Sequence, residues 1–153
     1  MNPRSFVFYW MPVLIWMFVI FAASTDLGSA EHTSRFLIPF LHWIDPAISW
    51  VAIRRIEFLI RKAAHLTEYA VLAVLLLRAL RSGWQRAFAQ QALLVLVIAG
   101  LYAMSDEFHQ TFTPSRTPAV RDVMIDCCGA AIGLAVYWTM RRMSERAPAA
   151  ATV

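Results

Sequence analysis

The sequence predicts an all-α integral membrane protein with four transmembrane helices. Of its 153 residues, 59% are hydrophobic, against about 45 to 50% in soluble domains, and the mean hydropathy is +0.55. Four separate stretches reach the roughly 17 to 25 apolar residues that a helix needs to cross the hydrocarbon core. Because lipid offers no hydrogen-bond partner to the backbone, these stretches must be helical.

The four predicted spans are residues 6–23, 63–80, 87–104 and 123–140. The first is interpreted as a retained helix, kinked or broken near Pro12. A signal peptide is the alternative, since Arg4 precedes the apolar run and small residues follow it. The length of the run and the lack of a clear A-x-A site favour the retained helix. The second and fourth spans are the informative ones, because they carry His65, Glu68 and Asp126.

Basic residues predict the orientation, because short cytoplasmic loops are enriched in Lys and Arg. Three segments on one side of a four-span bundle carry seven arginines, with Glu145 as their only acid: Arg4; Arg78, Arg81 and Arg86; Arg141, Arg142 and Arg146. Both termini are therefore expected in the cytoplasm. The net charge of +4 then reflects membrane orientation, and no nucleic-acid motif is present.

The first external loop, residues 25–62, is amphipathic and partly apolar. Its tryptophans and scattered arginines are typical of the headgroup layer, so we expect it to be partly interfacial. A lid over the bundle and a lipid-binding role are both open interpretations. Residues 1–146 form one predicted domain, and the Ala-rich tail at 147–153 is expected to be mobile.

Polar residues converge at the predicted outer ends of three spans. At 100° per residue, each helix gathers its polar side chains on one face. These faces carry Lys62, His65 and Tyr69 on the second span; Asp106, Glu107 and Gln110 after the third; and Asp122 and Asp126 on the fourth. On the fourth span the acidic face continues into Gly129 and Gly133, a G-x-x-x-G spacing that permits close helix packing.

Three interpretations of this polar cluster stay open. The first is a buried salt-bridge network that fixes helix register. The second is an acid/base site, in which crowded carboxylates and His65 exchange protons while Arg116 clamps a phosphate or carboxylate. The third is a metal site that uses His65, His109 and nearby carboxylates, although no H-E-x-x-H spacing is present. No P-loop, dinucleotide fingerprint or G-x-S-x-G elbow supports nucleotide or serine-hydrolase chemistry.

The polar segments together resemble the VanZ-like family. The resemblance rests on R-K-A-A-H-L-x-E-Y-x-x-L at 61–72, S-D-E-x-x-Q-x-F-x-P-x-R at 105–116, and D-x-x-x-D-x-x-G-x-x-x-G at 122–133. It implies a small multi-pass protein of the bacterial inner membrane, of the kind named for low-level teicoplanin resistance. Matched position by position, it implies catalytic roles for His65, Asp106, Glu107 and Asp122, and substrate-binding roles for Lys62, Tyr69, Gln110 and Arg116.

Two positions depart from the family pattern. Ser115 stands where the family usually has Gly, and Asp126 stands where it usually has Asn. The extra acid beside Asp122 favours a cation or a protonated carboxyl, or a different ligand. No reaction or cofactor follows from the resemblance. The expected partner is a membrane lipid or a lipid-linked envelope precursor, with a non-catalytic adaptor or scaffold as the alternative. A small transporter is less favoured, because the polar groups occupy one rim and do not line a path.

Overall fold

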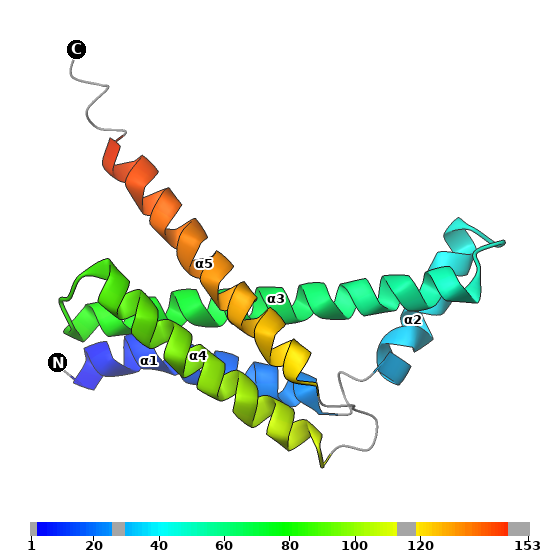
Figure 1. Cartoon of the computed structure of the whole chain (residues 1–153), viewed down its shortest axis with the longest axis horizontal. Helices are drawn as coiled ribbons and strands as arrows, with labels where there is room; N and C mark the ends of the chain where they lie inside the picture. Colours follow the sequence, from blue (N-terminus) through cyan, green and yellow to red (C-terminus); the bar gives the residue numbers. More distant parts are fainter. Residues whose placement is uncertain (1–2, 26–29, 113–118, 147–153) are drawn as a thin grey trace.

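A computed structural model describes residues 3–25, 30–112 and 119–146, which form five α-helices (Figure 1). They are α1 (Pro3–Ser24), α2 (Ala30–Ile44), α3 (Trp50–Gly83), α4 (Phe88–Gln110) and α5 (Val120–Arg146). All but α2 are long and apolar enough to cross a membrane, which confirms the predicted fold class. The predicted tail at 147–153 lies outside the described residues.

Two helices can be compared with their predicted form. The first, α1, is continuous through Pro12, so of the two predicted alternatives, a kink or a break, the break does not occur. The third, α3, begins at Trp50 and not at residue 63, because the Ser49 side chain caps it by accepting a hydrogen bond from the Ala52 backbone nitrogen at 3.2 Å. Its 34 residues correspond to about 51 Å at 1.5 Å per residue. One crossing of the hydrocarbon core needs about 30 Å.

The segment predicted as a loop at 25–62 is therefore largely helical. It contains α2 and the first turns of α3, and Figure 1 shows α2 beside the part of α3 that extends past α1 and α4. The Ser34 hydroxyl donates to a Glu57 carboxylate oxygen at 2.5 Å and so joins the two helices. The expected amphipathic character is clearest in α2, whose apolar residues gather on one face.

Helix α3 is the centre of the bundle, since it packs against each of the other four helices, most extensively against α5. The predicted glycine stripe makes this contact. A Cβ atom added at Gly129 would come within 2.9 Å of the Leu66 Cα atom, and one added at Gly133 within 2.8 Å of the Ala70 Cα atom. Only glycine permits this approach of the two backbones.

The apolar core follows one face of each central helix. Leu72 and Leu76 on α3 pack with Ala99 and Ala103 on α4 and with Ala130 on α5. The alanines let the helices approach closely, as small residues do in membrane bundles. Because these faces run the length of the helices, the residues at their ends also point into the bundle.

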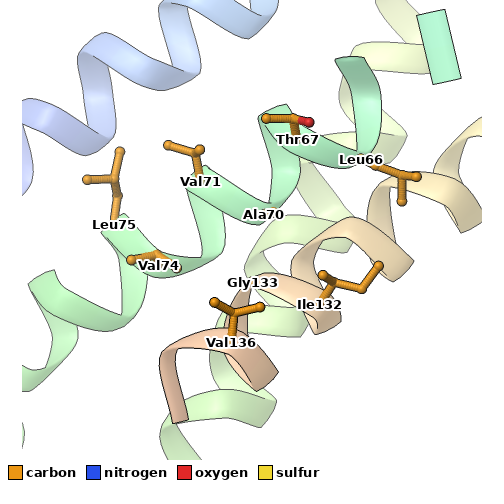
Figure 2. A pocket seen from close by; sticks show the side chains of 9 residues that line it. All are labelled: Leu66, Thr67, Ala70, Val71, Val74, Leu75, Ile132, Gly133 and Val136. Carbon is orange, nitrogen blue, oxygen red and sulfur yellow. The ribbon is translucent and has the colours of Figure 1, made fainter. Parts of the chain in front are cut away.

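An apolar groove lies on the α3–α5 seam (Figure 2). Its volume is about 380 Å³, and aliphatic side chains line almost all of it: Leu66, Val71, Val74, Leu75, Ile132 and Val136, with Thr67, Ala70 and Gly133. The Thr67 hydroxyl donates to the Ala63 carbonyl oxygen at 2.8 Å, so its hydrogen-bonding need is met within α3. The groove can hold a hydrocarbon chain, whereas groups able to move protons lie elsewhere.

Candidate functional site

The buried faces of three helices end in polar residues. On α3 the buried face continues from Leu72 through Tyr69 to His65; on α4 it passes from Ala103 to Asp106, Glu107 and Gln110; on α5 it includes Asp126. His65, Asp106, Glu107 and Gln110 are each at most 7% exposed, and Tyr69 and Asp126 are fully buried. These residues, with Lys62, Asp122 and Ser24, are called the polar cluster below.

Two charged pairs join α3 to α5. His65 Nδ1 lies 3.0 Å from Asp126 Oδ1, and Lys62 Nζ forms an ion pair with Asp122 Oδ1 one turn nearer the helix end. When Nδ1–H of His65 donates to Asp126, Nε2 carries the lone pair and is the nitrogen that can take a proton. Asp126 therefore orients the ring, and as an ionised acceptor it favours the tautomer with the proton on Nδ1.

Further hydrogen bonds bring in α1 and the start of α5. The Ser24 hydroxyl, at the end of α1, donates to Asp106 Oδ2 at 2.5 Å, and the Gln110 side-chain amide donates to the same oxygen at 3.2 Å. Glu107 Oε2 accepts from the Ala119 backbone nitrogen at 2.7 Å. The cluster thus connects α1, α3, α4 and α5, which a purely local salt bridge does not.

The acidic groups belong to one electrostatic network. Glu107 lies within electrostatic range of Asp106, Asp122 and Asp126, and Tyr69 lies within range of Asp106 and Asp126. Lys62 is the one permanent cation that pairs with this set within the described ranges 3–25, 30–112 and 119–146. Four carboxylates beside one lysine favour a shared proton or the binding of groups that donate hydrogen bonds.

Four buried polar atoms of the cluster have no hydrogen-bond partner among the described residues. They are the Tyr69 hydroxyl, Asp106 Oδ1, Glu107 Oε1 and Asp126 Oδ2. Buried polar atoms are rarely left without a partner, because the loss of solvation costs about 1 to 3 kcal/mol. Three of the four are carboxylate oxygens, so the matching ligand groups are hydroxyl, amide or ammonium donors.

Seven of the eight residues predicted for the site lie in this network: Lys62, His65, Tyr69, Asp106, Glu107, Gln110 and Asp122. Arg116, predicted to clamp the substrate, lies outside the described residues. The ring of His109, a residue of the metal alternative, packs on the Phe21 ring of α1, with 4.3 Å between the ring centroids.

The metal alternative gains no support from the geometry. Across the described ranges, no group of three His, Cys, Asp or Glu side chains is arranged to hold a metal ion. The two cysteines, Cys127 and Cys128, are free. Cys127 is partly buried and packs near Gly100, whereas Cys128 is exposed, so only the first acts as a packing residue.

Two members of the polar cluster, Asp126 and Ser24, are not among the eight residues for which the sequence predicts a catalytic or binding role. Asp126 had been placed on the acidic face of the fourth span, but its pairing with His65 depends on how α3 and α5 cross. Ser24 had no signal, since one hydroxyl at the end of an apolar run is common. Both became visible only when the helix ends were brought together.

Removing the Ser24 hydroxyl tests whether α1 is part of the site. In Ser24→Ala, Asp106 Oδ2 loses one of its two donors, and we expect the free energy of unfolding to fall by about 1.5 to 3 kcal/mol, the usual value for a hydrogen bond to a charged group. Unfolding titrations in detergent measure this. Ser105→Ala is the control, because the Ser105 hydroxyl donates only to its own helix, at the Tyr102 carbonyl oxygen. Equal stability of the two variants would contradict the assignment.

Fold and site together define a class: a small multi-pass helical membrane protein whose buried faces converge on an acidic, histidine-containing cluster at one end of the bundle. The sequence model of the VanZ/LLP1 family matches residues 6–141. The chain therefore belongs to the VanZ/LLP1 family. No curated protein and no solved structure gives a significant match. Membership identifies a membrane protein of a kind linked to glycopeptide resistance.

Proposed function

We propose that the polar cluster binds the headgroup of a membrane lipid or a lipid-linked envelope precursor, and that the protein thereby lowers susceptibility to teicoplanin. The observation that carries the proposal is the set of four buried polar atoms with unused hydrogen-bonding capacity at the end of the bundle. The helices around the cluster are long and apolar enough to be membrane spans. A ligand that reaches these four atoms from the bilayer is therefore a lipid. Family membership supports the link to glycopeptides.

The chemistry of the cluster suits a headgroup that carries both donors and an anionic group. Hydroxyl or amine donors of a sugar, peptide or ethanolamine match the oxygens of Asp106, Glu107 and Asp126 that have no partner among the described residues. We assign the anionic part, a phosphate or carboxylate, to Lys62 and Arg116. Lys62 keeps its partner Asp122 within reach, so a bound anion would share the ammonium group with that carboxylate.

Proton transfer is the proposed further role of the same residues. His65 is oriented by Asp126 through Nδ1, an arrangement that in general prepares Nε2 to accept a proton from a hydroxyl or from water. Asp106 and Glu107 lie in the same electrostatic network and can exchange that proton. Whether the bound headgroup is modified or only retained separates an enzyme from a binding protein.

The second candidate is a non-catalytic scaffold, and the interhelical contacts favour it. Lys62–Asp122, His65–Asp126 and Ser24–Asp106 each join two different helices. A network of this kind fixes the register of a bundle without any ligand. The two candidates differ for a change at an atom that joins no helices, such as Glu107 Oε1. There the scaffold predicts that function is lost only together with stability, whereas the ligand site predicts loss of function at unchanged stability.

Glu107→Gln is the variant that separates the two candidates. The amide oxygen can still accept from the Ala119 nitrogen, while the free acceptor Oε1 becomes an NH2 donor. We expect a fully folded protein that no longer protects a sensitised bacterial host against teicoplanin. The measurement is the minimal inhibitory concentration of teicoplanin and of vancomycin, with membrane levels matched through a C-terminal fluorescent fusion.

Glu145→Gln is the matched control for that assay. Glu145 is an exposed residue on α5 that pairs with Arg141 at 2.7 Å, and its substitution should leave protection unchanged. If Glu107→Gln protects as well as the control at equal abundance, the ligand site is wrong. If Glu107→Gln fails to accumulate in the membrane, the scaffold is the better account.

A further inference from the structure

An aromatic stripe runs along α2. Phe36, Phe40 and Trp43 are spaced i, i+4 and i+7 and are 77%, 53% and 79% exposed. At 100° per residue they lie within about 60° of arc. Aromatic surface on this scale is unfavourable in water, so the stripe is an interaction surface. The opposite side of α2 is held to α3 by the Ser34–Glu57 hydrogen bond.

An apolar hollow whose lining includes two arginines lies on the adjacent first turns of α3. It has a volume of about 420 Å³ and is lined by Val51, Arg54, Arg55, Phe58 and Leu59. All five side chains are exposed. Neither arginine forms an ion pair with any residue in the described part of the chain. The walls of the hollow are almost entirely apolar, so Arg54 and Arg55 line it mainly with the aliphatic parts of their exposed side chains.

The position of these features in the chain places them at the bilayer surface. Helix α2 begins at Ala30, shortly after α1 ends at Ser24, and α3 continues directly into a membrane span. Both are thus tethered to spans at their ends. Aromatic rings and arginines together are typical of the headgroup layer, where rings have one wet edge and guanidinium groups reach phosphates.

We propose that residues 34–62, called the surface hairpin, lie in the headgroup layer of the bilayer and bind the phosphate of an anionic phospholipid between Arg54 and Arg55. The aromatic stripe of α2 enters the upper part of the acyl chains, and Phe58 and Leu59 contact the glycerol end of the bound lipid. This site is separate from the polar cluster. The lipid site contains no residue of the polar cluster, and Lys62, at the end of the surface hairpin, is the one residue that the hairpin and the cluster share. The lipid site can therefore be tested independently of the proposed function.

Membrane depth tests the position of the stripe. A spin label is attached at Trp43→Cys on a Cys127→Ala/Cys128→Ala background, in protein reconstituted into phosphatidylethanolamine and phosphatidylglycerol vesicles. Collision with oxygen and with a water-soluble nickel complex reports depth. Leu93→Cys, exposed on the span α4, and Glu145→Cys, exposed near the end of α5, give the lipid and water limits. We expect Trp43→Cys to fall between them. Water-like accessibility overturns the proposal, and so does protection from both quenchers, which indicates a protein partner or a second copy.

Lipid selectivity tests the arginines. Thermal unfolding of the purified protein is followed in detergent while phosphatidylglycerol or phosphatidylcholine is added, and the shift gives an apparent affinity. We expect Arg54→Gln/Arg55→Gln to weaken phosphatidylglycerol binding roughly 30-fold, the ratio that corresponds to about 1 kcal/mol for each basic residue near an anionic surface. Arg54→Lys/Arg55→Lys should retain most of the affinity. An unchanged phosphatidylglycerol shift in the glutamine variant contradicts the site.

Discussion

Gly133→Ala is expected to separate α3 from α5 and to lower the free energy of unfolding by about 1 to 3 kcal/mol or more, the range for overpacking a close contact. The added Cβ would lie 2.8 Å from the Ala70 Cα atom, and Gly129→Ala would place one 2.9 Å from the Leu66 Cα atom. The obstructing atoms, Leu66 Cα and Ala70 Cα, both belong to the α3 backbone, so neither can move unless α3 itself shifts. The loss must therefore exceed the gain of about 1 kcal/mol that alanine brings to a helix over glycine.

Gly100→Ala is the control that makes this prediction sharp. Its added Cβ would meet only the Cys127 Sγ atom, at 3.5 Å, which is ordinary van der Waals contact. We expect Gly100→Ala to be neutral or slightly stabilising, because helix propensity is then the main effect. Unfolding titrations in mixed detergent compare the three variants. If Gly133→Ala is as stable as Gly100→Ala, the close crossing of α3 and α5 is wrong.

Asp126→Ala is the second variant expected to have a large effect. It leaves His65 Nδ1 buried without its carboxylate partner. An orphaned buried donor costs about 1 to 3 kcal/mol, and about 3 to 5 kcal/mol if the remaining partner is charged. Asp126→Asn should cost less, because its amide oxygen can still accept from the ring.

A double-mutant cycle isolates the pair from other effects of the substitutions. His65→Ala, Asp126→Ala and the double variant are compared by the free energy of unfolding. We expect a coupling of about 0.5 to 3 kcal/mol, as for residues in direct contact, so that the double variant loses less than the sum of the singles. Additive losses would show that the two side chains do not interact.

The parts of the fold that depend on periodic apolar patterns were predictable. Four runs of sufficient length specify four spans, and the spacing of Gly129 and Gly133 identified the α5 face that meets α3. The cluster was predictable for a related reason. Polar residues such as His65 and Asp106 continue the buried face of their own helix, so helical periodicity alone places them inside.

Other features could not be read from one sequence. The sequence did not predict helix α2, because Pro39, Pro46 and scattered charges are typical of a loop. It did not predict the early start of α3, because the cap by the Ser49 side chain depends on the local backbone geometry. The pairing of Lys62 with Asp122 and of His65 with Asp126 depends on the crossing of two helices. Periodicity gives the face of a residue but not its partner on another helix.

The most direct test of the central claim is binding of a polyprenyl-diphosphate-linked disaccharide precursor to the purified protein, measured by thermal unfolding against the bare polyprenyl diphosphate. We predict that the complete headgroup binds wild type and Glu145→Gln equally, and binds Glu107→Gln at least about tenfold more weakly, which is about 1.4 kcal/mol, with no difference in the stability of the free proteins. If the precursor binds no better than the bare lipid, or binds Glu107→Gln as tightly as wild type, the polar cluster is not a headgroup site for this ligand.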